Sequence, residues 1–241
     1  MTLGFVWQPG DFALSIDYYK TEITDAIGTL SAQAIVDTCF EYGIACDNVE
    51  IVNGSIESVS TRLFNIAERT TEGIDFEATY LVDNVADGMI TFRMLASHYM
   101  EVSFSPDRLN VIDDAGVVGS DSAGGLATPD WRGNLSADYV RGAFGLNAQV
   151  MYIAGGDLLN DQTPEDIDDN TVGSQTLFNL GLRYNLNVWG DSNLQLFAGI
   201  NNVFDQDPPI AASEFISNWS SNPIVYNLIG RNYYAGVRVD F

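Results

Sequence analysis

The chain has 241 residues, and its 33 acidic side chains outnumber its 10 basic ones, which gives a formal net charge of -23. This balance excludes a nucleic-acid-binding protein that relies on neutralising phosphates, because such a protein needs a basic surface. Hydrophobic residues make up 46% of the chain, which is too apolar for a disordered acidic protein.

The sequence contains no uninterrupted apolar run of the roughly 18 residues that a membrane helix requires. A transmembrane β-barrel stays possible, because its strands hide their apolar face by alternation. Only two cysteines and one histidine are present, which excludes most zinc and iron–sulfur sites. We therefore expect no cofactor.

Alternation of apolar and polar residues with period two predicts about nine β-strands. In chain order they cover residues 2–7, 12–28, 62–82, 89–103, 131–139, 143–154, 178–188, 193–203 and 233–241. In the segment 178–188, for example, Phe178, Leu180 and Leu182 alternate with asparagine, glycine and arginine. Each strand is thus expected to have one apolar face and one mostly polar face.

The predicted connections alternate between short and long. Short connections lie near residues 8–11, 83–88, 141–142 and 189–192, and long ones span about 29–61, 104–130, 155–175 and 204–230. Outer-membrane barrels have tight periplasmic turns at one end and long external loops at the other, so this pattern favours a membrane barrel. An odd strand number and a polar inner face indicate a piece of a wider barrel.

Four segments carry a resemblance to a known family. They are residues 73–77 (GIDFE), residues 201–209 (NNVFDQDPP), residues 230–234 (GRNYY) and the terminal Phe241. Taken in order, they resemble the carboxyl-terminal end of TonB-dependent outer-membrane receptors.

The resemblance implies an all-β, antiparallel transmembrane β-barrel that is partial. Residues 1–241 would form the carboxyl-terminal part of the receptor barrel, about nine of roughly 22 strands. The family's plug domain is absent from the sequence. The terminal strand, with Arg231, Tyr233 and Phe241, would close the barrel.

By the same resemblance, the complete protein would reside in the outer membrane of a Gram-negative bacterium and take up a scarce nutrient, such as an iron chelate, cobalamin or an oligosaccharide. Its partners would be outer-membrane lipid, a small-molecule or oligosaccharide ligand, and a TonB-type energy-transducing protein that acts through the missing plug region. We expect no nucleic-acid partner and no enzymatic activity. Two alternatives stay open: a passive porin-like channel, and a secreted soluble β-sandwich of a carbohydrate-active protein.

Cys39 and Cys46 lie in the first long connection. On an external face we expect them to form a disulfide, which would stiffen this loop. The alternative is a pair of buried free thiols.

The third long connection is rich in carboxylates. It contains Asp157, Asp161, Glu165, Asp166, Asp168 and Asp169. Carboxylate oxygens at this density could hold a hard cation such as calcium, although the spacing does not match an EF-hand loop. The alternative is a solvated acidic loop.

Aromatic and amide side chains of the first and last long connections are candidates for ligand binding. They are Phe40, Tyr42, Phe215, Trp219, Asn222 and Tyr226. Aromatic rings offer rigid contact area for sugars and planar chelates. Packing between loops explains the same residues equally well.

Overall fold

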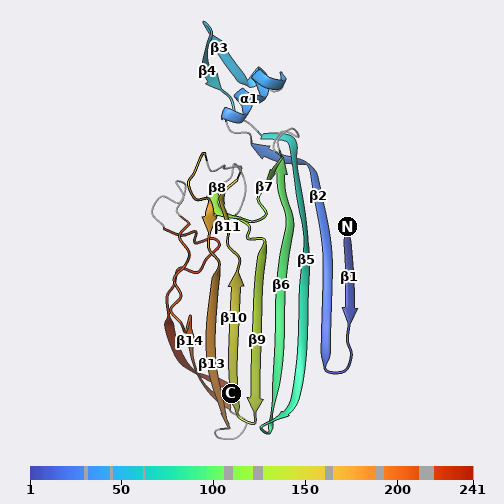
Figure 1. Cartoon of the computed structure of the whole chain (residues 1–241), viewed down its shortest axis with the longest axis vertical. Helices are drawn as coiled ribbons and strands as arrows, with labels where there is room; N and C mark the ends of the chain where they lie inside the picture. Colours follow the sequence, from blue (N-terminus) through green and yellow to red (C-terminus); the bar gives the residue numbers. More distant parts are fainter. Residues whose placement is uncertain are drawn as a thin grey trace.

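The structure, a computed structural model, describes residues 1–29, 32–43, 46–61, 63–105, 111–121, 127–160, 165–187, 193–211 and 220–240. Within these ranges nine strands form one antiparallel path in the order β1-β2-β5-β6-β9-β10-β13-β14-β15, and β7 pairs with β6 (Figure 1). Their bounds are β1 Thr2–Trp7, β2 Phe12–Thr29, β5 Leu63–Val85, β6 Gly88–Ser105, β7 Ile112–Asp113, β9 Trp131–Arg141, β10 Phe144–Ile153, β13 Gln175–Asn187, β14 Asn193–Asn201 and β15 Asn232–Asp240.

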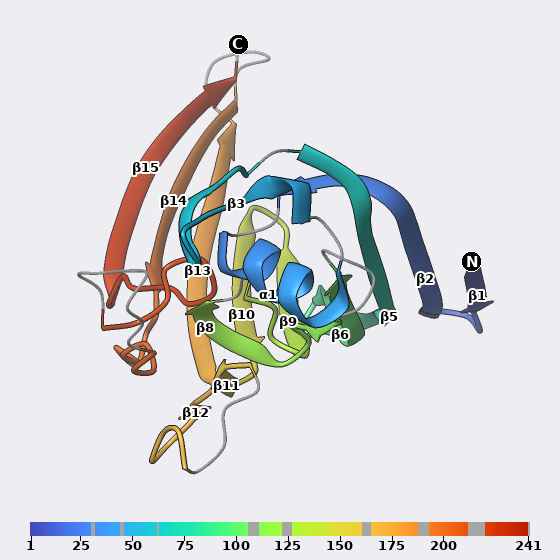
Figure 2. The ribbon, with the colours of Figure 1, turned by 90° about the horizontal axis from the view of Figure 1, so that it is seen from above.

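All nine strands predicted from alternation are confirmed, each within a few residues of its expected ends. Seen from above, the sheet curves into an open arc with β1 at one end and β15 at the other (Figure 2). Among the described strands, β1 pairs only with β2 and β15 pairs only with β14. The predicted partial barrel is therefore confirmed as an open, curved wall.

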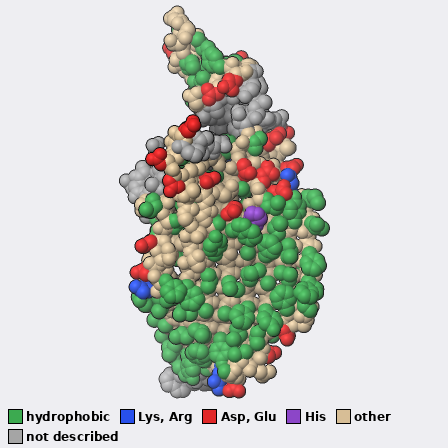
Figure 3. Space-filling model, viewed as in Figure 1, with side chains coloured by type: hydrophobic (Ala, Val, Ile, Leu, Met, Phe, Trp, Pro, Cys, Tyr) green, Lys and Arg blue, Asp and Glu red, His purple; other side chains and the backbone are tan. Residues whose placement is uncertain are grey.

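The register of the sheet aligns apolar side chains into rows across the outer face. One such row, read strand by strand, is Phe12, Tyr80, Phe92, Ala137, Ala148, Leu180, Ile200 and Tyr233. Large side chains on this face are open to the surroundings: Leu135 is 48% exposed and Leu182 is 49% exposed. Figure 3 shows the resulting apolar surface, with acidic side chains gathered above it.

This exposed face decides against the soluble β-sandwich. A sandwich buries the apolar faces of two sheets against each other, whereas in the described ranges the apolar face of the long sheet stays uncovered. A continuous apolar surface of this extent marks contact with lipid or another partner. The β-sandwich alternative is therefore wrong.

The apolar belt has the height of a bilayer. It runs from the row of Tyr152 and Thr176 down to the row of Leu186 and Leu194. Thr176 and Leu186 are ten residues apart on β13, or about 33 Å along a strand, which becomes about 25 Å at the tilt of about 40° found in membrane barrels. That height agrees with the apolar band of outer-membrane barrels.

The short and long connections lie at opposite ends of the wall, as predicted (Figure 1). We call these the turn end and the loop end. At the turn end, β5 and β6 are joined through Ala86 and Asp87, whose φ angles of 48° and 61° are typical of a two-residue type I′ turn. By the rule for outer-membrane barrels, the turn end faces the periplasm and the loop end faces outward.

The loop end carries its own secondary structure. The elements are α1 Ala32–Tyr42, η1 Cys46–Asn48, β3 Val49–Val52, β4 Ser55–Val59, β8 Val117–Asp121, β11 Gly156–Leu159 and β12 Thr171–Val172. A transmembrane strand needs about 9–11 residues, so β5, with 23 residues, extends well beyond the belt toward this end. Among the described residues, no helix is long and apolar enough to cross a membrane.

Candidate ligand-binding face

Three of the long connections fold together at the loop end. Along the chain, β8 belongs to the connection from β6 to β9, and β11 and β12 belong to the connection from β10 to β13. They form one small sheet in the order β12-β11-β8, in which β8 and β11 run parallel. The approach is close: a Cβ atom added at Gly119 would lie within 1.7 Å of the Leu158 carbonyl oxygen, so only glycine fits there.

A buried cluster joins this small sheet to the connection between β14 and β15. Its members are Val118, Val172, Ala211, Val225 and Tyr226, with Ala127, Ile153 and Leu158 packed against them. The cluster therefore draws residues from three loops that are far apart in the sequence. Because Ile153 is the last residue of β10, the cluster also anchors the loops to the wall.

Asn222 holds two of these loops together. Its side chain is 0% exposed, and its Nδ2 donates to the carbonyl oxygens of Val118 and Gly119, each at 3.0 Å. Its Oδ1 accepts a hydrogen bond from the Ile224 amide at 3.0 Å. The amide is thus used on both sides, and its partners are backbone groups.

Tyr226 has a comparable role. The side chain is 2% exposed, and its hydroxyl lies 3.2 Å from the carbonyl oxygens of both Ala154 and Gly173. Burial raises the pKa of Tyr226 to about 12, because the tyrosinate would lose its hydration. For Asn222 and Tyr226, the structure shows packing between loops, the alternative to direct ligand binding.

The remaining aromatic candidates lie elsewhere or outside the described residues. Phe40 lies on α1 and is 63% exposed. Tyr42 is the last residue of the same helix, and its side chain is outside the described set. Phe215 and Trp219 fall in the range 212–219, which is also outside the described residues. Among the candidates whose side chains the structure describes, Phe40 is the exposed one, and Asn222 and Tyr226 are buried.

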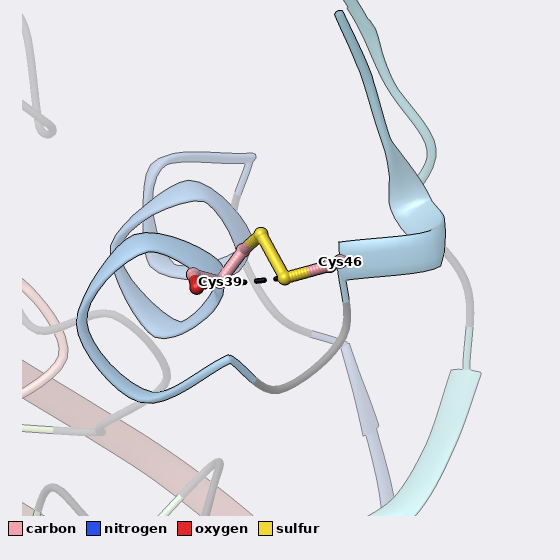
Figure 4. The surroundings of a disulfide bond; sticks show 2 residues. All are labelled: Cys39 and Cys46. Atoms are coloured by element: carbon pink, nitrogen blue, oxygen red, sulfur yellow. Dashed lines mark hydrogen bonds between the residues drawn. A yellow bond between two sulfur atoms is a disulfide. The ribbon is translucent and has the colours of Figure 1, made fainter.

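Helix α1 is tied to the following turn by a disulfide between Cys39 and Cys46 (Figure 4). The two Cα atoms are 4.8 Å apart. After the helix in the chain, β3 and β4 form a hairpin. Its turn is Asn53-Gly54, and both residues have a positive φ. Figures 1 and 2 together place this unit beyond the loop end of the wall and over the hollow of the arc.

The described carboxylates of the acidic loop are not gathered into a cation site. Asp157 lies on β11, whereas Glu165, Asp166, Asp168 and Asp169 follow in the connection to β12, and Asp161 is outside the described residues. No group of three or more potential metal ligands occurs in the part of the chain that the structure describes.

Asp169 shows what one of these carboxylates does. Its Oδ1 accepts hydrogen bonds from the hydroxyl and the amide of Thr171, at 2.7 and 2.9 Å. The hydrogen bond from the hydroxyl, and to a smaller extent the one from the amide, stabilise the carboxylate and hold the pKa of Asp169 below its usual value. The carboxylate therefore fixes the backbone just ahead of β12, whose first residue is Thr171.

The inner face of the wall is polar and charged. Arg93 donates to Glu77 at 2.8 Å, and the Ser97 hydroxyl donates to Asp75 at 2.6 Å. A hollow of about 330 Å³ lies on this face beside Asp17, Asp75 and Glu77. A packed core would exclude such groups, so this face is suited to water or to a polar segment filling the barrel.

At the start of the last strand, Arg231 is fixed to the end of β14. Its amide donates to Asp205 Oδ1 at 2.7 Å, and its guanidinium donates to the Val203 carbonyl oxygen at 3.2 Å. Tyr233 pairs with Ile200 on the apolar outer face. Phe241 lies outside the described residues. Thus the two ends of the last long loop are clamped side by side.

Sequence reasoning missed one residue that shapes this face. Gln175 is 1% exposed, donates to the Asn227 carbonyl oxygen at 2.9 Å and accepts from the Asn227 amide at 2.9 Å. The Gln175 side chain thus makes the pair of hydrogen bonds that a neighbouring strand would make with Asn227, and it attaches the last loop to β13. The sequence signal was only a polar residue just ahead of a strand, which is common and unspecific.

Comparisons with known proteins agree with this geometry. A family model described as "TonB dependent receptor-like, beta-barrel" matches residues 1–203. No curated protein gives a significant match. A solved ferric enterobactin receptor, PfeA from Pseudomonas aeruginosa, is 14% identical with a TM-score of 0.62, and the match covers 99% of this chain and 30% of that one.

The FrpB iron transporter from Neisseria meningitidis is 15% identical with a TM-score of 0.57, and the match covers 98% of this chain and 30% of that one. At such identities the likeness shows a shared fold. The chain spans about 30% of the length of both solved proteins.

Proposed function

The chain belongs to the TonB-dependent receptor β-barrel family of the Gram-negative outer membrane, and from this we propose that it is the carboxyl-terminal part of a barrel that imports a scarce nutrient. The family is one of transport receptors and not of enzymes. In this proposal the chain supplies wall, external loops and closing strand. A TonB-type protein of the inner membrane supplies the energy by acting on the receptor's plug domain.

The observation that carries the proposal is the contrast between the two faces of the wall. The outer face is an apolar belt of bilayer height, and the inner face presents paired charges such as Arg93 with Glu77. A curved wall with this polarity encloses a water-accessible or plug-filled lumen. The solved proteins of the same fold support receptor-type import, since one is named a ferric enterobactin receptor and the other an iron transporter.

Among the possible nutrients we favour an iron chelate. The two solved proteins of similar fold are a ferric enterobactin receptor and an iron transporter. In this proposal, the unit of α1 and the β3–β4 hairpin, which lies over the hollow of the arc, makes the first contact with the ligand (Figure 2). Phe40 would offer its exposed ring, and the Cys39–Cys46 disulfide would keep the helix in one shape, which lowers the entropy lost on binding.

Uptake assays with the full-length protein test this proposal. Cells starved of iron would be given radiolabelled ferric enterobactin, and in parallel labelled cobalamin and a labelled oligosaccharide. We expect deletion of the gene to abolish uptake of the iron chelate, and deletion of the TonB-type protein to do the same. A Phe40→Ala variant should bind the chelate more weakly, while Phe204→Ala, which removes an even more exposed ring outside the α1 unit, should not.

Each other outcome has a defined meaning. Uptake of cobalamin or oligosaccharide in place of the iron chelate would contradict the choice of ligand, but it would agree with the proposal that the protein is an import receptor. Uptake that continues without the TonB-type protein would identify a passive channel and overturn the proposal. Equal losses in Phe40→Ala and Phe204→Ala would remove the role of the α1 unit.

A further inference from the structure

A groove interrupts the lipid-facing side of the wall near β15. In one register row, Leu182 of β13 is followed by Ala198 of β14 and Ala235 of β15. The two alanines lie below the bulky row that ends in Tyr233, so the surface is hollowed between them and that row. The groove has a volume of about 440 Å³ and is lined by Leu146, Leu180, Leu182, Ala198, Ile200 and Tyr233, among others.

The groove continues toward the turn end. A second hollow of about 300 Å³ shares Leu182 and Ala198 with the first and reaches Phe144, Tyr184 and Leu196. From Ile200 to Leu196 the two hollows together follow β14 for four residues, or about 13 Å. The groove is therefore elongated along the strands, nearly without polar lining, and its combined size is that of a pocket for a small elongated molecule.

A cation of the outer face lies beside the lower end of this groove, whereas Arg183, which also borders the second hollow, belongs by alternation to the inner face. Arg141, the last residue of β9, pairs in register with Phe144, which pairs with Tyr184. Alternation places Arg141 on the same outer face as Tyr139 and Phe144. Its side chain is 55% exposed and meets one carboxylate, Asp87, at 2.8 Å.

The aromatic neighbours fix the level of this cation in the membrane. Tyr139 and Phe144 contact each other edge to face, with ring centroids 6.4 Å apart, at the border of the apolar belt. Aromatic rings at this position mark the headgroup level of a bilayer. Arg141 thus lies where a lipid phosphate lies, and the groove extends from there into the acyl-chain region.

We propose that this face binds one phospholipid of the periplasmic leaflet, with an acyl chain in the groove and the phosphate on Arg141. The turn end faces the periplasm, so the lipid is a phospholipid and not a lipopolysaccharide of the outer leaflet. A guanidinium has five N–H donors, so Arg141 can keep its bond to Asp87 and still donate to a phosphate.

Shape and charge together separate this lipid from its neighbours in the bilayer. Between apolar surfaces within a membrane there is no hydrophobic driving force, and association depends on van der Waals packing and polar contacts. A groove lets one chain touch protein on several sides, which multiplies weak dispersion contacts. The phosphate contact then fixes which end of the lipid lies at Arg141.

Native mass spectrometry of the full-length protein tests the proposal. The protein is extracted in mild detergent, stripped of lipid in steps, and then given phosphatidylethanolamine. We expect one tightly retained lipid, and about tenfold weaker retention in Ala198→Leu, which fills the groove, and in Arg141→Gln, which removes the charge-assisted hydrogen bond. Ala137→Leu makes the same change on the outer face away from the groove, and Asp87→Asn leaves Arg141 its charge, so both should retain the lipid.

Folding of every variant is checked by the heat-dependent gel mobility of intact barrels. Equal lipid loss in Ala198→Leu and Ala137→Leu, or no retained lipid in the unaltered protein, would overturn the groove. Unchanged retention in Arg141→Gln would overturn the phosphate contact. The outcome is independent of nutrient uptake, because the groove lies on the outer face and the uptake assay reads the lumen and loops.

Discussion

Replacing Asn222 by alanine should release the packed loops while leaving the membrane wall intact. The side chain makes three hydrogen bonds, to the carbonyl oxygens of Val118 and Gly119 and from the amide of Ile224. At about 1 kcal/mol for each buried hydrogen bond, the loss is about 3 kcal/mol of local stability. Because each 1.4 kcal/mol is a factor of ten, opening of the loop cluster should become about 100-fold more frequent.

Hydrogen exchange measured by mass spectrometry reports this opening directly. Amides of β8 and of residues 222–226 should exchange about 100-fold faster in Asn222→Ala, whereas amides in the middle of β9 and β10 should not change. Asn222→Asp should have at least as large an effect, because a carboxylate accepts from Ile224 but cannot donate to two carbonyl groups.

The matched control is Asn185→Ala. Asn185 lies near the turn end and accepts one exposed hydrogen bond from Gln195 at 2.8 Å. This variant should leave the loop amides as they are. If Asn222→Ala left the exchange of β8 unchanged, or if it accelerated exchange over the whole sheet, the idea that this side chain locks the loops to each other would be refuted.

Three further predictions concern the loops and the belt. Tyr226→Phe should weaken the same loop cluster by about 1 kcal/mol, and the tyrosinate absorbance titration should lose one group near pH 12. Because the folded pKa of Tyr226 is raised above 10.0, its stabilising contribution is complete below pH 10 and is lost as the pH rises toward 12; a difference titration without a high-pH component would contradict this. Replacing both Cys39 and Cys46 by serine should lower the stability of the α1 unit by about 2.5 kcal/mol, the chain-entropy estimate for so short a loop. Residues 32–59 should then be cleaved faster by a protease while the barrel stays intact. An unchanged rate of proteolysis would show that packing alone holds the helix. Leu135→Lys should destabilise the barrel in lipid by about 2–4 kcal/mol, measured by denaturant unfolding from liposomes, whereas Ser136→Lys on the inner face should cost little; equal costs would disprove the assignment of the two faces.

The strands of the wall could be predicted because their signal is local. Alternation in 178–188 predicted both a strand and its apolar face, and the structure places β13 at Gln175–Asn187 with Leu180 and Leu182 outward. A strand that faces lipid on one side and a polar lumen on the other repeats every two residues whatever its partners are. The alternation of short and long connections likewise predicted the two ends of the wall.

The interior of the long connections was predicted far less well. Residues 29–61 were expected only as a loop, yet they contain α1 and the β3–β4 hairpin. The Asn53-Gly54 pair is a strong hairpin signal that sequence reasoning did not use. Helix α1 is short, and its stability comes from packing of Ile35, which is 0% exposed, and from the disulfide more than from its own propensity.

By itself, the sequence determined that the chain is a curved antiparallel wall with an apolar outer face, because the alternation of apolar and polar residues repeats along each strand. Only the tertiary structure decided what the loop residues do. Asn222 and Val118 are 104 positions apart in the sequence, and their hydrogen bond exists because three loops meet over one end of the wall. No local pattern encodes that meeting, so a polar side chain that could equally well have touched a ligand proved to be a buried link between loops.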